Sequence, residues 1–100
     1  MKPDELRDIM DFLRQRVHLE VGDTADRVAI RFDAPSVADM AAAGLNPEGS
    51  QKVLAAPWWD EMVSDVVETP EMCEPEDAPE QVLEYARDVV SEYIRKRATL

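Results

Sequence analysis

The sequence predicts an all-α fold, a small single domain over 1–100 built as a bundle of four or five helices, with an acidic, proline-rich connector over 69–79 before the last helix. Three observations favour this class. Apolar residues recur at helical spacing in three long segments, and only one short run alternates like a strand. A chain of 100 residues also suffices for one domain but not for two. The segments that begin at Pro3, Pro57 and Asp77 should form the main core, and the middle helices should pack over one end of it.

The first helix is expected over 3–20. Pro3 fits the first turn of a helix, and Asp4 and Glu5 follow where the helix dipole favours carboxylates. Apolar side chains at spacings of three and four follow this start, and they are Leu6, Ile9, Met10, Leu13 and Val17. Gly22 can end the helix.

The stretch 23–33 fits two patterns. Val28, Ile30 and Phe32 alternate like a strand. The same stretch also matches one helical face, which is formed by Ala25, Val28, Ala29 and Phe32. A lone strand would leave its backbone donors and acceptors unsatisfied, and no second strand-like run stands out to pair with it. We therefore expect a helix here and keep a strand as the alternative.

Two short helices should follow. Ser36 and Asp39 have the spacing of a capping box, and Gly44 can end the helix that they begin. The stretch 46–49 is rich in turn residues, and Ser50 is expected to cap one or two further turns.

The segment 36–54 has the outline of a helix-turn-helix, the unit with which many proteins read DNA. Lys52 is its only basic residue, so phosphate contacts would lack donors. The whole chain carries a net charge of -11, from 22 Asp and Glu against 11 Lys and Arg, and such a field repels phosphate backbones and anionic membranes. We expect neither nucleic acid nor a membrane as a direct partner.

The second half of the chain holds the clearest amphipathic pattern. A helix is expected from Pro57, with apolar pairs spaced by four, of which Met62 and Val66 lie in the middle. The next stretch, 69–79, contains three prolines and several acids, so it is interpreted as an extended, solvated connector. The last helix should begin near Asp77 and end in Arg95, Lys96 and Arg97, where the helix dipole favours cations.

The most unusual feature of the sequence is its acidic region. Ten carboxylates lie over 60–84, and no Lys or Arg occurs between Lys52 and Arg87. Clustered charge speeds the encounter with an oppositely charged partner, so the region is predicted to dock a protein with a basic surface, although a purely solvated face is the alternative. The predicted partner-binding residues are Trp58, Trp59, Glu71, Glu74, Glu76 and Asp77.

The adjacent Trp58 and Trp59 belong to this prediction because of their spacing. On a helix, neighbouring side chains point about 100° apart, so one ring is expected at the rim of the core, where aromatic residues often anchor partners. The alternative places both rings along a wide buried stripe.

Catalytic and metal-binding patterns are weak. His18 and Cys73 are the sole residues of their kinds and lie far apart in sequence, and the three glycines form no phosphate-binding loop. We assign no catalytic residue, no metal ligand and no cofactor.

The predicted function is that of a small acidic protein-binding module, with an accessory, inhibitory or regulatory role. Two alternatives stay open: a divalent-metal-binding protein or enzyme that uses carboxylates, and a mimic of nucleic-acid charge that blocks a DNA-binding protein. Self-association as a homodimer through the last helix is a further option. A cytoplasmic location is expected, because the single cysteine forms no internal disulfide and the residues after Lys2 lack the apolar core of a signal peptide.

Overall fold

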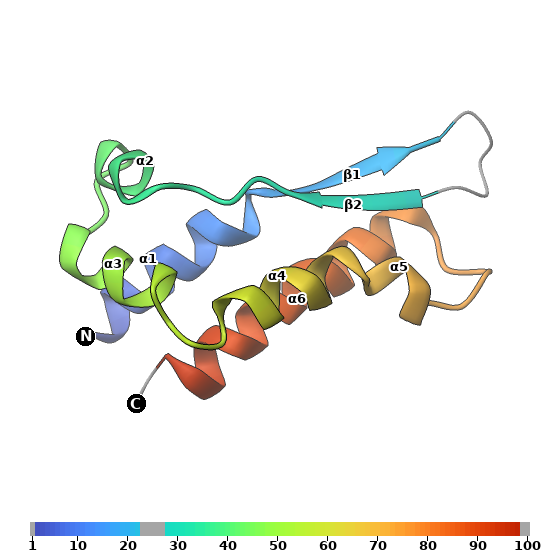
Figure 1. Ribbon diagram of the computed structural model, residues 1–100. Coiled ribbons are helices and arrows are strands. Elements are labelled where there is room, and N and C mark those ends of the chain that lie inside the picture. Colours follow the sequence, from blue (N-terminus) through green and yellow to red (C-terminus); the bar gives the residue numbers. More distant parts are fainter. Residues whose placement is uncertain (1, 23–27, 99–100) are drawn as a thin grey trace.

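A computed structural model describes residues 2–22 and 28–98, and these residues form six helices and one two-stranded antiparallel sheet (Figure 1). The all-α prediction is therefore wrong, and the fold is mixed. The elements in chain order are α1 (Pro3–Arg14), β1 (Val17–Val21), β2 (Val28–Phe32), α2 (Val37–Ala42), α3 (Pro47–Leu54), α4 (Trp59–Val67), α5 (Thr69–Met72) and α6 (Pro79–Arg97).

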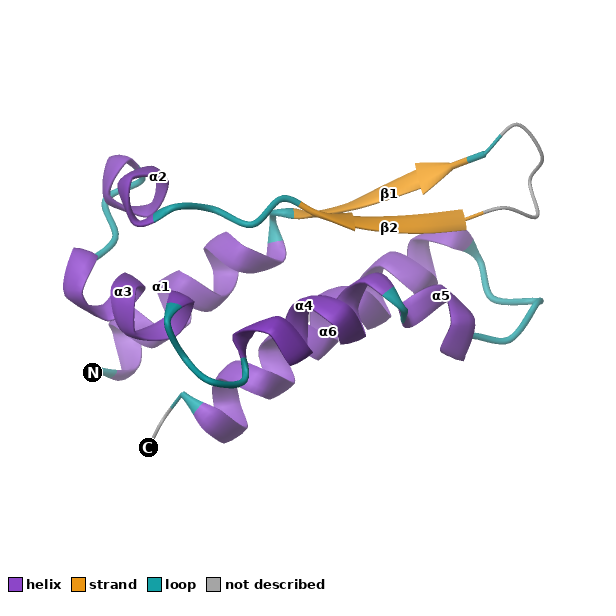
Figure 2. Ribbon diagram, in the orientation of Figure 1, coloured by secondary structure: helices purple, strands orange, loops and turns teal. Residues whose placement is uncertain are grey.

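The hairpin of β1 and β2 covers one side of the helices, as Figure 2 shows. The long helix α6 lies between α1 and α4 and also contacts both strands and α5. Helices α2 and α3 pack against each other at the end of the molecule where both termini lie, and α5 lies at the opposite end. The molecule is elongated, with extents of 42 × 25 × 21 Å.

The first helix ends at Arg14, six residues earlier than expected, because the residues that follow pair as a strand. The sequence Val-His-Leu-Glu-Val over 17–21 alternates apolar and polar residues, and it is the second strand with which 28–32 pairs. The register runs from Val17 opposite Phe32 to Val21 opposite Val28. The helix expected over 23–33 is therefore wrong for 28–32, while 23–27 lie outside the described residues.

Burial on one face of the hairpin explains why these segments form strands, in which side chains alternate between two faces, and do not form a helix. Val17 and Ile30 are buried on the helix side, whereas Glu20 and Arg31 are exposed and form an ion pair of 3.1 Å. A shift of the pairing register by one residue would move the buried side chains of a strand to the solvent face, so burial also fixes the register.

The capping box that begins α2 is confirmed. The Ser36 hydroxyl accepts a hydrogen bond from the Asp39 amide, and the Asp39 carboxylate accepts one from the Ser36 amide. This second bond lowers the pKa of Asp39. Gly44 follows the helix at a φ of 87°, a conformation that residues with a β-carbon rarely adopt.

The start of α3 differs from the prediction. Asn46, not Ser50, is the cap, and its side chain accepts hydrogen bonds from the amides of Glu48 and Gly49. Ser50 instead lies inside the helix, fully buried, with its hydroxyl donating to the Asn46 carbonyl. Asn46-Pro47 is a good helix start because proline has no amide hydrogen to leave unpaired in the first turn.

The connector expected to be extended over 69–79 is partly helical. Thr69–Met72 forms the single turn α5, since Pro70 lies in its first turn, where a proline is tolerated. The rest, 73–78, is loop and turn and leads into α6 at Pro79. The prolines therefore begin two helices here and do not exclude them.

The core is formed by apolar stripes of α1, α4 and α6 and the inner face of the hairpin, and Met40 of α2 and Val53 of α3 add to it. The buried apolar residues of α6 recur every four positions. The buried apolar side chains of the three long stripes are Ile9, Leu13, Met62, Val66, Val82, Ala86, Val90 and Ile94. The expected core of the segments from Pro3, Pro57 and Asp77 is confirmed by the contacts of α1 and α4 with α6. The expected packing of the middle helices over one end also agrees with Figure 1.

Two arginines join the end of α1 to the middle of α6. The Arg14 guanidinium donates hydrogen bonds to the Arg87 carbonyl and the Ser91 hydroxyl, and the Arg87 guanidinium donates to the Arg14 carbonyl at 3.1 Å. These bonds satisfy the last carbonyl of α1 just before the chain turns into β1.

Met62→Ala should destabilise the fold by about 2 to 5 kcal/mol, because Met62 is fully buried against α6 and its truncation leaves a cavity. Urea unfolding measures the change. Val67→Ala on the same helix is the matched control, since Val67 is 45% exposed, and we expect a loss below about 1 kcal/mol there. Equal losses in both variants would contradict the assigned inner face of α4.

Arg14→Ala should cost about 1.5 to 3 kcal/mol, because it removes charged hydrogen bonds to two part-buried acceptors on α6. Arg7→Ala, on the same helix, is the control: Arg7 forms an exposed ion pair with Asp4 at 3.4 Å, so its removal should change stability by less than about 0.5 kcal/mol. If both substitutions gave the same unfolding midpoint, the Arg14 bonds would have no role in stability.

Candidate functional site

A groove of about 400 Å³ lies between the end of α4, α5 and one side of α6. We call it the acidic groove; it is lined by Asp65, Glu68, Thr69, Met72, Cys73, Tyr85, Val89, Glu92 and Tyr93. Three of these residues are carboxylates, and none of the described lining residues is a cation. We call the apolar lining residues the floor of the groove and its three carboxylates the rim.

Two large apolar side chains at this groove are exposed to solvent. Met72 is 86% exposed and Tyr85 is 45% exposed. Exposed apolar residues that gather at a groove are typical of surfaces that bind other proteins, and Met and Tyr suit such surfaces because they pack adaptably or offer a rigid ring. The arrangement can anchor an apolar side chain of a partner.

Tyr93 forms one wall of the acidic groove. Its hydroxyl donates a hydrogen bond to the Asp65 carboxylate. Burial of the ring and this bond both raise the pKa of Tyr93, so the phenol stays protonated at neutral pH. The Arg97 guanidinium lies over the same ring, 5.0 Å from its centre. Tyr93 is thus held by a hydrogen bond and by a cation–π contact.

Cys73 is the thiol of the groove. It donates a hydrogen bond to the Thr69 carbonyl at 3.3 Å, and burial and the nearby Asp77 raise its pKa. A raised pKa makes the reactive thiolate scarcer, which is the opposite of what an activated nucleophile needs.

Glu92 on the rim of the groove pairs with Lys96. The hydrogen bond from Lys96 lowers the pKa of Glu92, so this carboxylate is charged at neutral pH.

The structure brings most of the predicted acidic residues together beside this groove. Glu71, Glu74 and Glu76 are exposed on α5 and the loop that follows it, next to Met72 and Cys73 in the chain. Asp77 differs from them, because its carboxylate accepts a hydrogen bond from the Glu74 amide at 2.9 Å and so shapes the loop.

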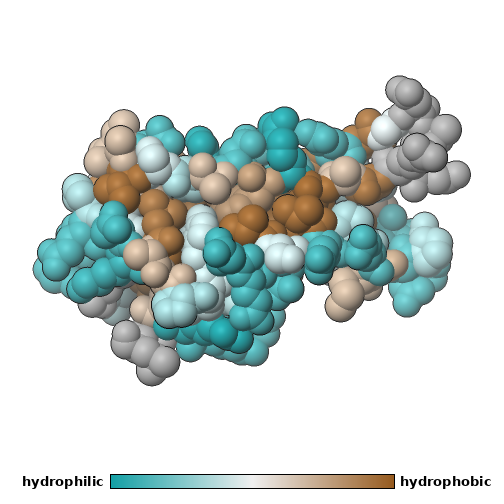
Figure 3. All heavy atoms as spheres, in the orientation of Figure 1, coloured by the Kyte–Doolittle hydropathy of each residue, from teal (hydrophilic) through white to brown (hydrophobic). Residues whose placement is uncertain are grey.

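The two tryptophans lie elsewhere, at the start of α4. Both are part-buried and pack against the core. The Trp59 ring contacts Phe32 of the hairpin at 5.9 Å between centres, and the Trp58 ring contacts Tyr93 at 6.0 Å. Figure 3 shows a band of apolar residues across the middle of the face where the hairpin side meets α4. Neither tryptophan lines the acidic groove.

Sequence reasoning missed the residues that form the floor of the groove. Met72 was hidden in a segment interpreted as extended, and Tyr85 and Val89 lie beside the core stripe of α6. The available signal was their spacing of four residues along α6, which indicates a second apolar face next to the core face.

Neither a metal site nor a membrane span is found in the described part of the chain. No group of three or more His, Cys, Asp or Glu side chains there could hold a metal ion. None of the described helices is long and apolar enough to cross a membrane. No protein-family model, no curated protein and no solved structure matches the chain.

Added salt should raise the stability of the fold. Ten carboxylates over 60–84 repel one another, and the screening distance falls from about 30 Å at 0.01 M to about 8 Å at 0.15 M salt. A gain of about 1 kcal/mol corresponds to roughly 4 to 8 °C in the melting temperature of a domain this size. Thermal melts at the two NaCl concentrations measure it.

The control for this prediction is the triple variant Glu71→Gln, Glu74→Gln, Glu76→Gln, in which the salt gain should shrink. A melting temperature that is unchanged or lower at 0.15 M NaCl would mean that local contacts already compensate the acids.

Proposed function

We propose that this protein is a small protein-binding module whose acidic groove takes a basic partner segment that carries an apolar anchor residue. The observation that carries the proposal is the exposure of Met72 and Tyr85 at a groove whose rim holds three carboxylates and, among the described lining residues, no cation. The apolar floor would hold the anchor, and the rim carboxylates would meet the partner's cations.

The acids beside the groove support the same partner. Glu71, Glu74 and Glu76 are exposed and extend the negative surface beyond the rim. Charges at the edge of an interface act mainly on the rate of encounter, while anchors in the centre act on the rate of dissociation. A module of this kind would act by contact, as an accessory, inhibitory or regulatory protein, and the single cysteine supports a cytoplasmic location.

The apolar floor favours this role over the other candidates. A mimic of nucleic-acid charge needs spaced carboxylates but no exposed Met72 or Tyr85. Nucleophilic catalysis is disfavoured at the groove, since the pKa values of Cys73 and Tyr93 are both raised.

A library of random twelve-residue peptides displayed on phage tests the proposal at 0.15 M NaCl. Selection against the wild-type protein should enrich peptides that combine Lys or Arg with an apolar residue. The best of them is then synthesised, and its kinetics are measured by surface plasmon resonance. Tyr85→Ala should speed its dissociation by about 30-fold, which is about 2 kcal/mol. The variant Glu71→Lys, Glu74→Lys, Glu76→Lys should instead slow association and weaken its dependence on salt.

A charge-matched control separates the groove from the net charge of the protein. The variant Asp8→Lys, Asp11→Lys, Glu48→Lys changes the net charge equally at exposed positions on α1 and α3. It should keep most of the wild-type association rate. The proposal is wrong if no basic peptide is enriched, or if both triple variants bind the selected peptide alike. Concentration-dependent sedimentation that is lost in Tyr85→Ala would point to a second copy of the chain as the occupant.

A further inference from the structure

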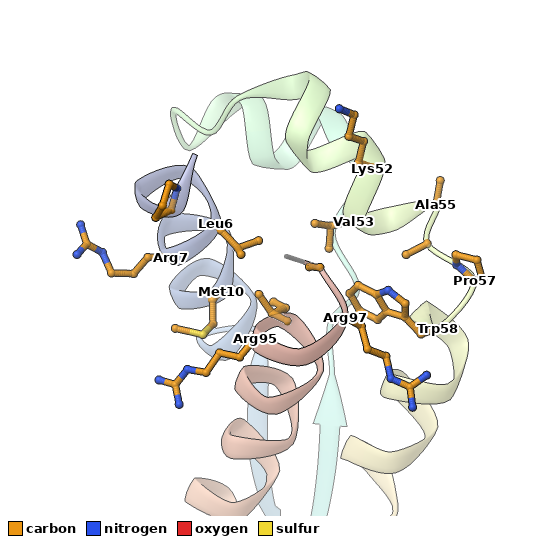
Figure 4. A pocket seen from close by; sticks show the side chains of 14 residues that line it. Leu6, Arg7, Met10, Lys52, Val53, Ala55, Pro57, Trp58, Arg95 and Arg97 are labelled. Carbon is orange, nitrogen blue, oxygen red and sulfur yellow. The ribbon is translucent and has the colours of Figure 1, made fainter. Parts of the chain in front are cut away.

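A second and larger groove, of about 790 Å³, lies at the other end of α6, where it meets α1, α3 and the loop before α4 (Figure 4). Leu6, Val53 and Trp58 point toward its centre, and Ile94 also lines it. We call it the basic-rimmed groove, because Arg7, Lys52, Arg95 and Arg97 line it as well. Its volume falls in the range of about 300 to 1,000 Å³ that is usual for ligand sites.

The charge of this rim opposes that of the rest of the molecule. Four of the fourteen lining residues are cations, and none of the described lining residues is a carboxylate. The whole chain has the reverse balance, with 22 acids against 11 basic residues. The end of a helix favours cations, and this explains Arg95 and Arg97 on α6. It also fits Lys52, which lies in the last turn of α3, but it does not explain Arg7 near the start of α1, which completes the same rim.

The carboxylates that contact these cations are held loosely. Arg7 pairs with Asp4 at 3.4 Å, Lys52 with Glu48 at 3.9 Å, and Arg97 with Glu61 at 3.6 Å. All six side chains are at least half exposed. Pairs of this kind contribute between about 0 and 1 kcal/mol, so a ligand's carboxylates can replace them at little cost.

We propose that the basic-rimmed groove binds an acidic peptide segment with an apolar anchor residue. The charged ends of the four cations lie around the perimeter, away from the apolar centre and on different sides of it (Figure 4). A ligand with a single anionic head reaches one part of that perimeter. A peptide with one central apolar side chain and acidic residues on both sides reaches several parts at once.

A nucleic acid fits this surface less well, although it is also an anion. A strand longer than the groove would run onto a surface that carries a net charge of -11 over the whole chain. A short peptide does not extend that far. At 0.15 M salt the screening distance of about 8 Å is also small beside the 42 Å length of the molecule, so the distant acids repel a peptide weakly.

The same phage library tests this site independently of the acidic groove, because the two sites select opposite charges. Selections are run in parallel against the wild-type protein, the variant Arg7→Glu, Lys52→Glu, and the control Arg31→Glu, Lys96→Glu. The control has the same change in net charge, and Arg31 and Lys96 are exposed and lie outside the groove. Circular dichroism and thermal melts verify that each protein is folded.

We expect peptides with an apolar residue flanked by Asp or Glu from the wild-type and control selections, and their loss from the Arg7→Glu, Lys52→Glu selection. The best such peptide is then titrated in a Trp59→Phe background, where Trp58 is the single tryptophan. Binding should shift Trp58 emission, and Arg7→Glu, Lys52→Glu should weaken it at least tenfold.

Three results would overturn the proposal: no acidic peptides are enriched, the same acidic peptides come from all three selections, or twelve-residue oligothymidylate shifts Trp58 emission at lower concentration than the peptide does. Whether basic peptides are enriched from the same library tests the acidic groove alone. Failure of one site is therefore distinguishable from failure of the other.

Discussion

The structure depends on the burial of one side of α6. Its buried apolar residues recur every four positions from Val82 to Ile94, and α1, α4, α5 and both strands pack against this helix. Because β1 follows α1 after two residues and β2 pairs with it, the position of the hairpin is fixed by the contact of α1 with α6. The bonds between Arg14 and Arg87 hold that contact at the point where the chain changes from helix to strand.

The sequence was most informative where a long apolar period met a clear start and end. The helices predicted from Pro57 and from near Asp77 are present as α4 and α6, two residues later at each start, and Met62 and Val66 are buried as expected. The hairpin could not be predicted. Val17 continues the spacing of the helix before it, and Val28 and Phe32 fit the pattern of a helix as well as that of a strand. Only the pairing of 17–21 with 28–32, which is a contact between segments, decides between the two. Local propensity does not contain that information.

The candidate sites also combine features that the sequence shows with features that only the fold shows. The excess of acids over 60–84 is a property of composition and is visible in the sequence. The two grooves are not, because each is built from several elements that are separated along the chain. The terminal cations Arg95 and Arg97 were interpreted as the end of a helix, and only the fold places Arg7 and Lys52 beside them. Trp58 was assigned to the acidic surface but lies in the groove of the opposite charge.

The orientation of α6 gives the molecule a further property. The helix is about 28 Å long, with the acidic loop 73–78 at its N-terminal end and Arg95, Lys96 and Arg97 at its C-terminal end. These opposite charges at its two ends form an electric dipole along α6. An approaching charged body exerts a torque on such a dipole and turns it before contact, so the sign of the other surface selects which end arrives first. Collisions are then no longer random in direction, and this removes part of the rotational search that limits most protein associations.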